Sequence, residues 1–361
     1  MMKPQLSIVA TSRNDNHGGD LIKRMQIFID GIVEQSKQYN LNIELILVEW
    51  NPPPDKPGLR DVLKWPERIL PCSIRIIEVP PAVHNTFKYS NGLPLFQMIA
   101  KNAGIIRARS DFVLSTNIDI IFSDKLMAYL SSGELQRGKI YRVNRHDVSR
   151  ELYSYKSFGE LLSACDSHTI RISHRYGITD CINKVTSRFF PEFLPIPFMG
   201  KRLWLIPGWK YVVSQGDKKL IRLVYRLFGQ YRNWLRLHTN ACGDFTLMSR
   251  DDWNLIRGAP ELELFSLHLD SLVCFIAYYA GIEEVVIDAP IYHIEHDSGW
   301  TPEAEKDRSL YKRLEDRKVP VMSIKELDNW IAHMHRKKAP LIHNSEDWGL
   351  ARMNLKETVI N

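Results

Sequence analysis

The sequence predicts an α/β protein with a doubly wound, mostly parallel sheet and helices on both faces. The early chain alternates short apolar runs, which suit buried strands, with segments whose apolar residues recur at helical spacing. Residues 96–123 then have the pattern of a helix, a turn and a buried strand that ends in polar residues. At 361 residues, with 44% hydrophobic and 25% charged residues, the chain can form one large domain with excursions or two modest domains.

The first half contains four apolar runs of strand length, at residues 6–10, 43–48, 73–79 and 112–114. A helix is predicted to begin near Asp20, because apolar residues from Ile22 to Val33 fall on one face. Residues 139–145 alternate polar and apolar side chains, which predicts a further strand of the sheet.

Polar residues follow three of these strands, at the edge where open α/β sheets bind ligands. Residues 11–19 form a Gly-containing loop before a helix, and such a loop can hold phosphate through backbone N–H groups. Glu49 ends the second strand. Asn117 and Asp119 end the fourth, where a spacing of two places both side chains on one side and a carboxylate can hold a divalent cation. Each of these features has a structural alternative. Residues 11–19 could be a plain strand-to-helix connection, Glu49 an acid that is solvated at a strand end, and Asp119 the first residue of a turn.

Residues 149–238 lack this regular alternation. Within them, residues 188–238 hold ten Lys/Arg against two Asp/Glu, a net charge of +8, and 11 of the 37 aromatic residues. Apolar residues from Leu220 to Leu235 lie at helical spacing between arginines. This pattern predicts a basic amphipathic helix that lies on an anionic membrane surface or packs on its own domain. Because the excess charge is local, the +6 of the whole chain does not indicate nucleic-acid binding.

The second half returns to regular structure. We expect a strand within 238–247, a helix from Arg250, an apolar helix from 267 to 279 and a last strand at 285–287. His293 and His296, three positions apart after that strand, could both face a cation. A tail helix around 324–334 is expected to pack back across the domain. The predicted divisions are 1–148, 149–238, 239–300 and 301–361, the last as a helical tail.

The order of several motifs resembles the family-2-like glycosyltransferases of the GT-A fold. In the first half, Lys101-Asn102-x-Gly104 precedes the strand that ends in Asn-x-Asp. In the second half, Gly-Asp-Phe at 243–245, a helix, Gly-x-x-Glu at 258–261, a helix with an acid, a strand and a histidine follow in order. The resemblance implies an inverting glycosyltransferase that moves a sugar from a nucleotide diphosphate, UDP by family frequency, to a hydroxyl group in polysaccharide or glycolipid synthesis.

The resemblance also implies roles for individual residues. Asp119, with His296 and His293, would hold Mn²⁺ or Mg²⁺. Asp270 would be the catalytic base, with Asp244 and Glu261 as acceptor-side candidates. Asn117 stands where the family has an aspartate, and His-Leu-Asp replaces the usual Glu-Asp pair before the second helix. The donor-binding candidates are Thr11, Ser12, Arg13, Asp15, Glu49, Lys101, Asn102, Asn117 and Asp119.

Two other functions remain open, a sugar-nucleotide nucleotidyltransferase and an inactive glycosyltransferase-like binding or scaffold protein. The nucleotidyltransferase would be expected to carry a Gly-rich, Arg-containing loop directly after the first strand and a Pro-Lys downstream. Five cysteines without a C-x-x-C pair, and no apolar run near ~20 residues, favour a cytoplasmic protein, peripheral at the inner face of the membrane. The expected partners are a nucleotide-diphosphate sugar, a carbohydrate or lipid-linked acceptor and an anionic membrane surface, with no nucleic acid.

Overall fold

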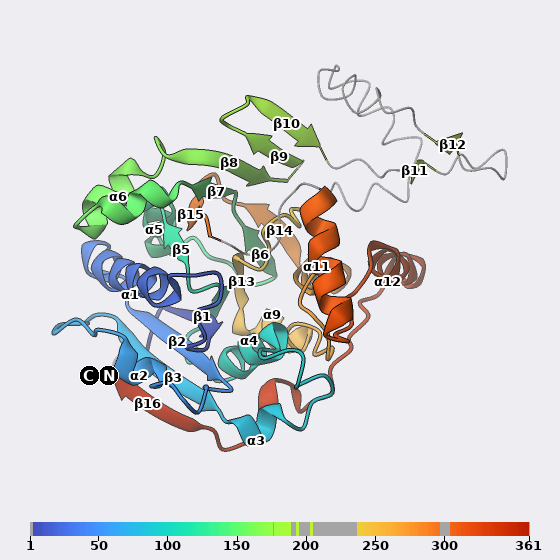
Figure 1. Ribbon diagram of the computed structural model, residues 1–361, viewed down its shortest axis with the longest axis horizontal. Coiled ribbons are helices and arrows are strands. Elements are labelled where there is room, and N and C mark those ends of the chain that lie inside the picture. Colours follow the sequence, from blue (N-terminus) through green and yellow to red (C-terminus); the bar gives the residue numbers. More distant parts are fainter. Residues whose placement is uncertain are drawn as a thin grey trace.

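The computed structural model describes residues 3–175, 177–188, 193–194, 203–204, 237–296 and 304–360. The predicted basic amphipathic helix lies outside the described residues. Two sheets dominate the fold, and helices cover the larger one (Figure 1). No helix in the described part of the chain has the length and apolarity needed to cross a bilayer.

The larger sheet has eight strands in the order β14-β6-β13-β4-β1-β2-β3-β16. β1 pairs in parallel with β2 and β4, and β2 pairs in parallel with β3, whereas β13 runs antiparallel between β4 and β6. This arrangement confirms the predicted mixed, mostly parallel sheet. Its strands are β1 Leu6–Ser12, β2 Ile43–Trp50, β3 Ser73–Val79, β4 Phe112–Thr116, β6 Lys139–Arg142, β13 Phe245–Ser249, β14 Glu283–Val286 and β16 Lys356–Ile360.

Helices cover both faces of this sheet because the strands are apolar on both sides. Leu6, Ile8 and Ala10 of β1 belong to one core with helices α1 and α5, while Val9 belongs to a second core with α4, α9, α10 and α12. A Cβ at Gly104 of α4 would lie 2.4 Å from Val9, so this glycine lets the helix lie directly on the sheet. These helices are α1 Leu21–Gln38, α4 Gln97–Ile105, α5 Asp124–Ser131, α9 Arg250–Leu255, α10 Leu269–Tyr279 and α12 Ile324–Lys337.

The second sheet has six strands in the order β10-β9-β8-β7-β15-β5. Residues 117–119 connect β4 of the first sheet to β5 of the second, so Asn117 and Asp119 lie where the two sheets separate. The strands are β5 Ile120–Phe122, β7 Arg145–Val148, β8 Thr169–His174, β9 Gly177–Asp180, β10 Val185–Arg188 and β15 Ile291–Ile294. The remaining elements are α2 Leu59–Val62, α3 Pro81–His84, η1 Arg150–Ser154, α6 Phe158–Ala164, α11 Ala304–Asp316, η2 Trp348–Leu350 and the strand pair β11 Phe193–Leu194 and β12 Leu203–Trp204.

Several predicted element boundaries were wrong. Residues 139–145 do not form one strand, because β6 belongs to the first sheet and β7 begins at Arg145 in the second. The strand expected within 238–247 begins only at Phe245, and the residues before it form turns. The strand predicted at 285–287 is not the last, since β15 and β16 follow it.

The tail beyond residue 300 is more than a helical tail. It contains α11 and α12, and its final strand β16 pairs antiparallel with β3 at the edge of the large sheet. The predicted tail helix is confirmed, and Leu327, Ile331 and Met334 of α12 pack into the core that contains α10.

Candidate cation and catalytic site

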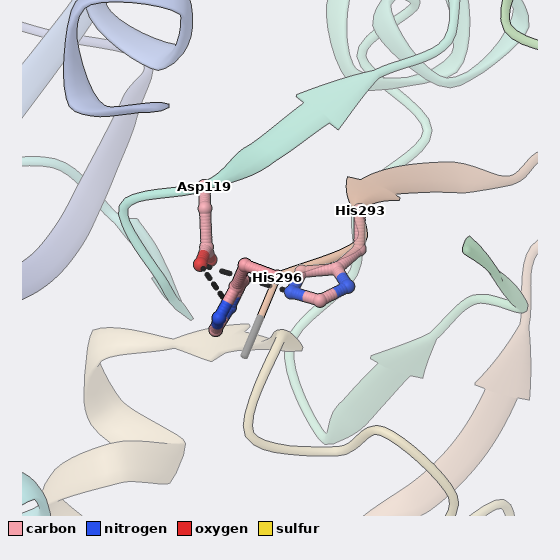
Figure 2. Close-up of side chains that lie close together, drawn as sticks. All are labelled: Asp119, His293 and His296. Atoms are coloured by element: carbon pink, nitrogen blue, oxygen red, sulfur yellow. Dashed lines mark ion pairs between the residues drawn. The ribbon is translucent and has the colours of Figure 1, made fainter. Parts of the chain in front are cut away.

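Asp119, His293 and His296 converge beside the carboxyl end of β4 (Figure 2). Asp119 lies in the turn before β5, His293 lies on β15, and His296 follows two residues after that strand ends. The Oδ2 atom of Asp119 lies 3.1 Å from Nε2 of His296 and 3.7 Å from Nε2 of His293. Residues from two distant parts of the chain thus present one carboxylate and two imidazoles to a common point.

These three side chains fit a divalent cation. Ligand atoms that each lie about 2.0–2.2 Å from one cation are separated from one another by about 3.0–3.6 Å, close to the separations observed. The potential ligand atoms all lie within 4.8 Å of one another. The Nδ1 atom of His296 is buried without a hydrogen-bond partner and contacts the backbone around Gly18, where a Cβ would lie only 2.5 Å from it. The set of two imidazole nitrogens and one carboxylate oxygen suits a divalent transition-metal ion.

Arg24 of α1 provides a positive charge at this cluster. Its Nη1 donates to Oδ2 of Asp119 at 2.6 Å, and the pair is almost fully buried. The rest of its guanidinium donates to the carbonyl oxygens of His17 and Gly19. Arg24 therefore connects the first loop to Asp119, and it shares with both histidines the oxygen that a cation would bind.

The ionisation of the cluster follows from these contacts. Burial by itself raises the pKa of Asp119, but hydrogen bonds and charge from His293 and His296 hold that pKa well below its usual range. Burial lowers the pKa of His293, whereas its hydrogen bonds to Asp119 and Asp147 raise it more, to about 9. Asp119 is therefore anionic at neutral pH, as a cation ligand requires.

Asn117 does not join the cluster but makes a separate contact with Asp244. Its Nδ2 donates to Oδ1 of Asp244 at 2.5 Å, and its Oδ1 accepts from Gln97 at 2.9 Å. The other carboxylate oxygen of Asp244 accepts from Arg145 at 2.7 Å. The spacing of two was expected to place Asn117 and Asp119 on one side of a strand, but β4 ends at Thr116 and both residues lie beyond it.

Lys101 and Asp270 meet at Gly243. The buried Nζ of Lys101 donates to the carbonyl oxygen of Gly243 at 2.7 Å, and the N–H of Gly243 donates to Oδ2 of Asp270 at 2.9 Å. The Oδ1 of Asp270 accepts from the backbone N–H of Ser271 at 2.8 Å. Asp270 lies in the first turn of α10. Gly243 therefore links Asp270, the predicted base, to Lys101 in the first half of the chain.

The first-loop candidates lie at the end of β1 and in the loop after it, and two of them contact β2 or the residue that follows it. Thr11 donates to the carbonyl oxygen of Val48, and Arg13 donates to that of Asn51. Ser12 is buried, and Asp15 accepts from the backbone N–H of His17. These contacts fix the loop between β1 and α1 next to the residues that Arg24 binds.

Glu49 is buried and is the last residue but one of β2, which ends at Trp50 and not at Glu49 as predicted. Its Oε1 accepts from the backbone N–H of Leu59 at the start of α2 at 2.8 Å. Burial raises the pKa of Glu49, and the bond from Leu59 lowers it by less. The contact of Glu49 in the structure is thus with the first turn of a short helix.

Asn102 and Glu261 belong to a buried junction with the tail. Asn102 exchanges two hydrogen bonds with the backbone of Ala259 and donates to Glu261 at 2.9 Å. Glu261 also accepts from the N–H of Gly349 at 2.7 Å, and burial raises its pKa. Both side chains are used within the protein, so they hold α4, the segment before α10 and the tail together.

Sequence reasoning missed three residues of the site, Arg24, Arg145 and Asp147. Arg24 lies on a helix that was predicted only from its apolar face. Arg145 and Asp147 lie on β7; Arg145 was interpreted as the end of the strand predicted at 139–145, and Asp147 lay beyond it. A charged residue at a buried position is a signal of such a site. The local sequence pattern did not show that these three positions are buried.

The comparisons with known proteins give likenesses in structure but none in sequence. No protein-family model matches the sequence, and no curated protein matches it. Among solved structures, the chain is similar to "Crystal structure of GalNAc-T7 with UDP, GalNAc and Mn2+", with 11% identity and a TM-score of 0.43. The match covers 94% of this chain and 59% of that one, so this chain spans less than two thirds of that protein's chain. We base the function on the side chains of the site and not on this likeness.

Proposed function

We propose that the protein is a metal-dependent, inverting glycosyltransferase that moves a sugar from a nucleoside diphosphate, UDP in the first instance, to a hydroxyl group of a carbohydrate or lipid-linked acceptor. The observation that carries the proposal is the cluster of Asp119, His293 and His296 at the ligand-binding edge of the sheet, beside the loop after β1. A bound Mn²⁺ or Mg²⁺ would stabilise the diphosphate leaving group.

The residues of the site would have separate roles in the reaction. Asp119, His293 and His296 would hold the cation, and the loop at 11–19, which Arg24 connects to Asp119, would contact the diphosphate. As the acceptor oxygen bonds to the anomeric carbon and the bond to the diphosphate breaks, the acceptor proton needs a base. Because the donor sugar is attacked from the opposite face, the anomeric configuration inverts.

Asp270 is the best candidate for that base. Both of its oxygens accept from backbone N–H groups, of Gly243 and Ser271. In contrast, Asp244 is paired with Arg145 and Asn117, and Glu261 is used in the junction with the tail. Asp270 thus has neither the arginine partner of Asp244 nor the place in the tail junction that Glu261 has.

The experiment compares wild type with Asp270→Asn and Asp119→Asn in the same samples. We expect UDP to raise the melting temperature of wild type more with Mn²⁺ than with chelator, by a stabilisation of ~2.7 kcal/mol at a hundredfold excess over Kd. Asp270→Asn should keep this shift and transfer sugar roughly 10²–10⁴-fold more slowly. Asp119→Asn should lose the metal-dependent part of the shift.

Three outcomes separate the alternatives. No shift with UDP, GDP or CDP contradicts a donor site. A nucleotide shift without transfer or hydrolysis of a nucleotide sugar favours an inactive binding or scaffold protein, which the ion pair of Arg24 with Asp119 also fits. Near-normal transfer by Asp270→Asn assigns the base to another residue, with Asp244 and Glu261 the next to test.

A further inference from the structure

Asp147 lies behind the cation cluster and faces three nitrogen-bearing side chains. It is on β7, adjacent to β15 in the second sheet, and its carboxylate is fully buried. Its Oδ1 lies 3.0 Å from Nδ1 of His293 and 3.0 Å from Nε of Arg145. Its Oδ2 accepts from Arg171 at 2.7 Å and from Arg145 at 3.2 Å. A fully buried carboxylate is costly unless charged or hydrogen-bonding partners surround it, as these three side chains surround Asp147.

The contact with His293 determines which ring nitrogen is available to a ligand. A histidine whose Nδ1–H is bound by a carboxylate has its ring orientation fixed, and Nε2 is left to bind a metal ion. In this structure Nε2 of His293 is the atom that faces Asp119. The backbone pairing of His293 with Asp147 across β15 and β7 holds the two side chains in register.

Arg145 extends the arrangement to the acceptor-side candidates. It contacts Asp147 through Nε and Nη2, and its Nη1 donates to Asp244, which in turn accepts from Asn117. Asp119 follows Asn117 by two residues, so the backbone between them links these contacts to the cation cluster. Arg145 and Arg171 supply the positive charge that allows Asp147 to remain buried as a carboxylate.

We propose that Asp147 is a positioning residue for the cation site: it fixes the imidazole of His293 through Nδ1 so that Nε2 faces the cation held by Asp119 and His296. This inference rests on the proposed function only in that a divalent cation binds there. It assigns no chemical step to Asp147.

The test measures cation binding without nucleotide or sugar. Mn²⁺ is titrated into wild type, Asp147→Asn and Arg171→Gln, with free Mn²⁺ followed by its electron paramagnetic resonance signal. We expect Asp147→Asn to weaken Mn²⁺ binding by about 10–100-fold. Arg171→Gln also removes a partner of Asp147, but on Oδ2 and away from His293, so its Kd should stay within about threefold of wild type. The visible absorption of bound Co²⁺ should change in Asp147→Asn and not in Arg171→Gln.

The outcomes distinguish this inference from the proposed function. Wild-type affinity and an unchanged Co²⁺ spectrum in Asp147→Asn overturn the inference, as does equal weakening by Arg171→Gln. If Asp147→Asn does not fold, Asp147→Glu keeps the charge for both arginines but displaces the carboxylate by one methylene group, and it should weaken Mn²⁺ at least tenfold. Wild type that binds Mn²⁺ without transferring sugar contradicts the function and leaves the inference intact. Wild type that binds no Mn²⁺ overturns both.

Discussion

Asn117 illustrates how one residue can depart from a motif for a physical reason. Its amide donates to Oδ1 of Asp244 at 2.5 Å in a partly buried environment. A carboxylate at position 117 would place two negative charges at this separation, and like charges in a buried setting are strongly unfavourable. The structure therefore explains the asparagine by its neighbour and not by cation binding.

Asn117→Asp should consequently destabilise the protein without tightening Mn²⁺ binding. We expect a loss of about 1–3 kcal/mol in the free energy of unfolding, because a hydrogen bond is replaced by an uncompensated charge. Urea denaturation at pH 7 measures the loss. The double variant Asn117→Asp/Asp244→Asn restores a donor and an acceptor at the contact and should recover part of the stability. Tighter Mn²⁺ binding with unchanged stability would assign Asn117 to the cation site instead.

The residues of the site divide into those that the sequence could indicate and those it could not. Asp119 comes after β4 and His296 after β15, and the position of a polar residue after an apolar run is visible locally, whereas His293 lies on β15 itself. Arg24 contacts Asp119 across 95 positions, and His293 contacts Asp147 across 146. Such contacts depend on which strands become neighbours, and a single sequence contains no local sign of that pairing.

At the scale of elements, apolar runs predicted β1 to β4 and the surrounding helices well, because those strands are buried on both faces. The edge strand β16 was not predicted. Its sequence is Lys-Glu-Thr-Val-Ile, and most of its side chains are exposed, so no apolar pattern distinguishes it from a loop. Charge fixes it at the sheet edge: Arg75 of β3 donates two bonds of 2.7 Å to Glu357 while also binding the buried Glu44.

Glu357→Gln should weaken the attachment of β16 to β3 more than Lys356→Ala, a substitution at the adjacent residue. Arg75 is buried and would lose a bidentate carboxylate, which we expect to cost about 1–2 kcal/mol. Lys356 pairs with Glu78 in a largely exposed contact, so its loss should cost below about 0.5 kcal/mol. Amide hydrogen exchange of 356–360 and urea denaturation test both. Equal effects of the two variants would show that backbone pairing alone holds β16.

At the scale of the whole molecule, Lys101 joins the two halves of the chain. It belongs to α4 in the first half, and its ammonium donates to Gly243 in the second, beside Asp244 and Asp270. Burial lowers the pKa of Lys101 to about 8, although the nearby carboxylates raise it. A fully buried lysine at this junction makes the stability of the fold depend on pH.

We expect the free energy of unfolding to gain a positive slope with pH above about 8. Between about 8 and the unfolded value of ~10.4, the unfolded chain holds a proton that the folded protein has released, so stability rises by up to about 1.4 kcal/mol per pH unit from this group. Below about 8 both states are protonated and the slope disappears.

Lys101→Met, which has no titrating group, removes the slope. Urea denaturation of wild type and Lys101→Met at pH 7, 8, 9 and 10 gives the difference between their free energies of unfolding. The titration of tyrosines and cysteines is common to both proteins and cancels in this difference. The stability of wild type relative to the variant should therefore rise between pH 8 and 10. Parallel curves over that range would mean that Lys101 has the same pKa in the folded and the unfolded protein.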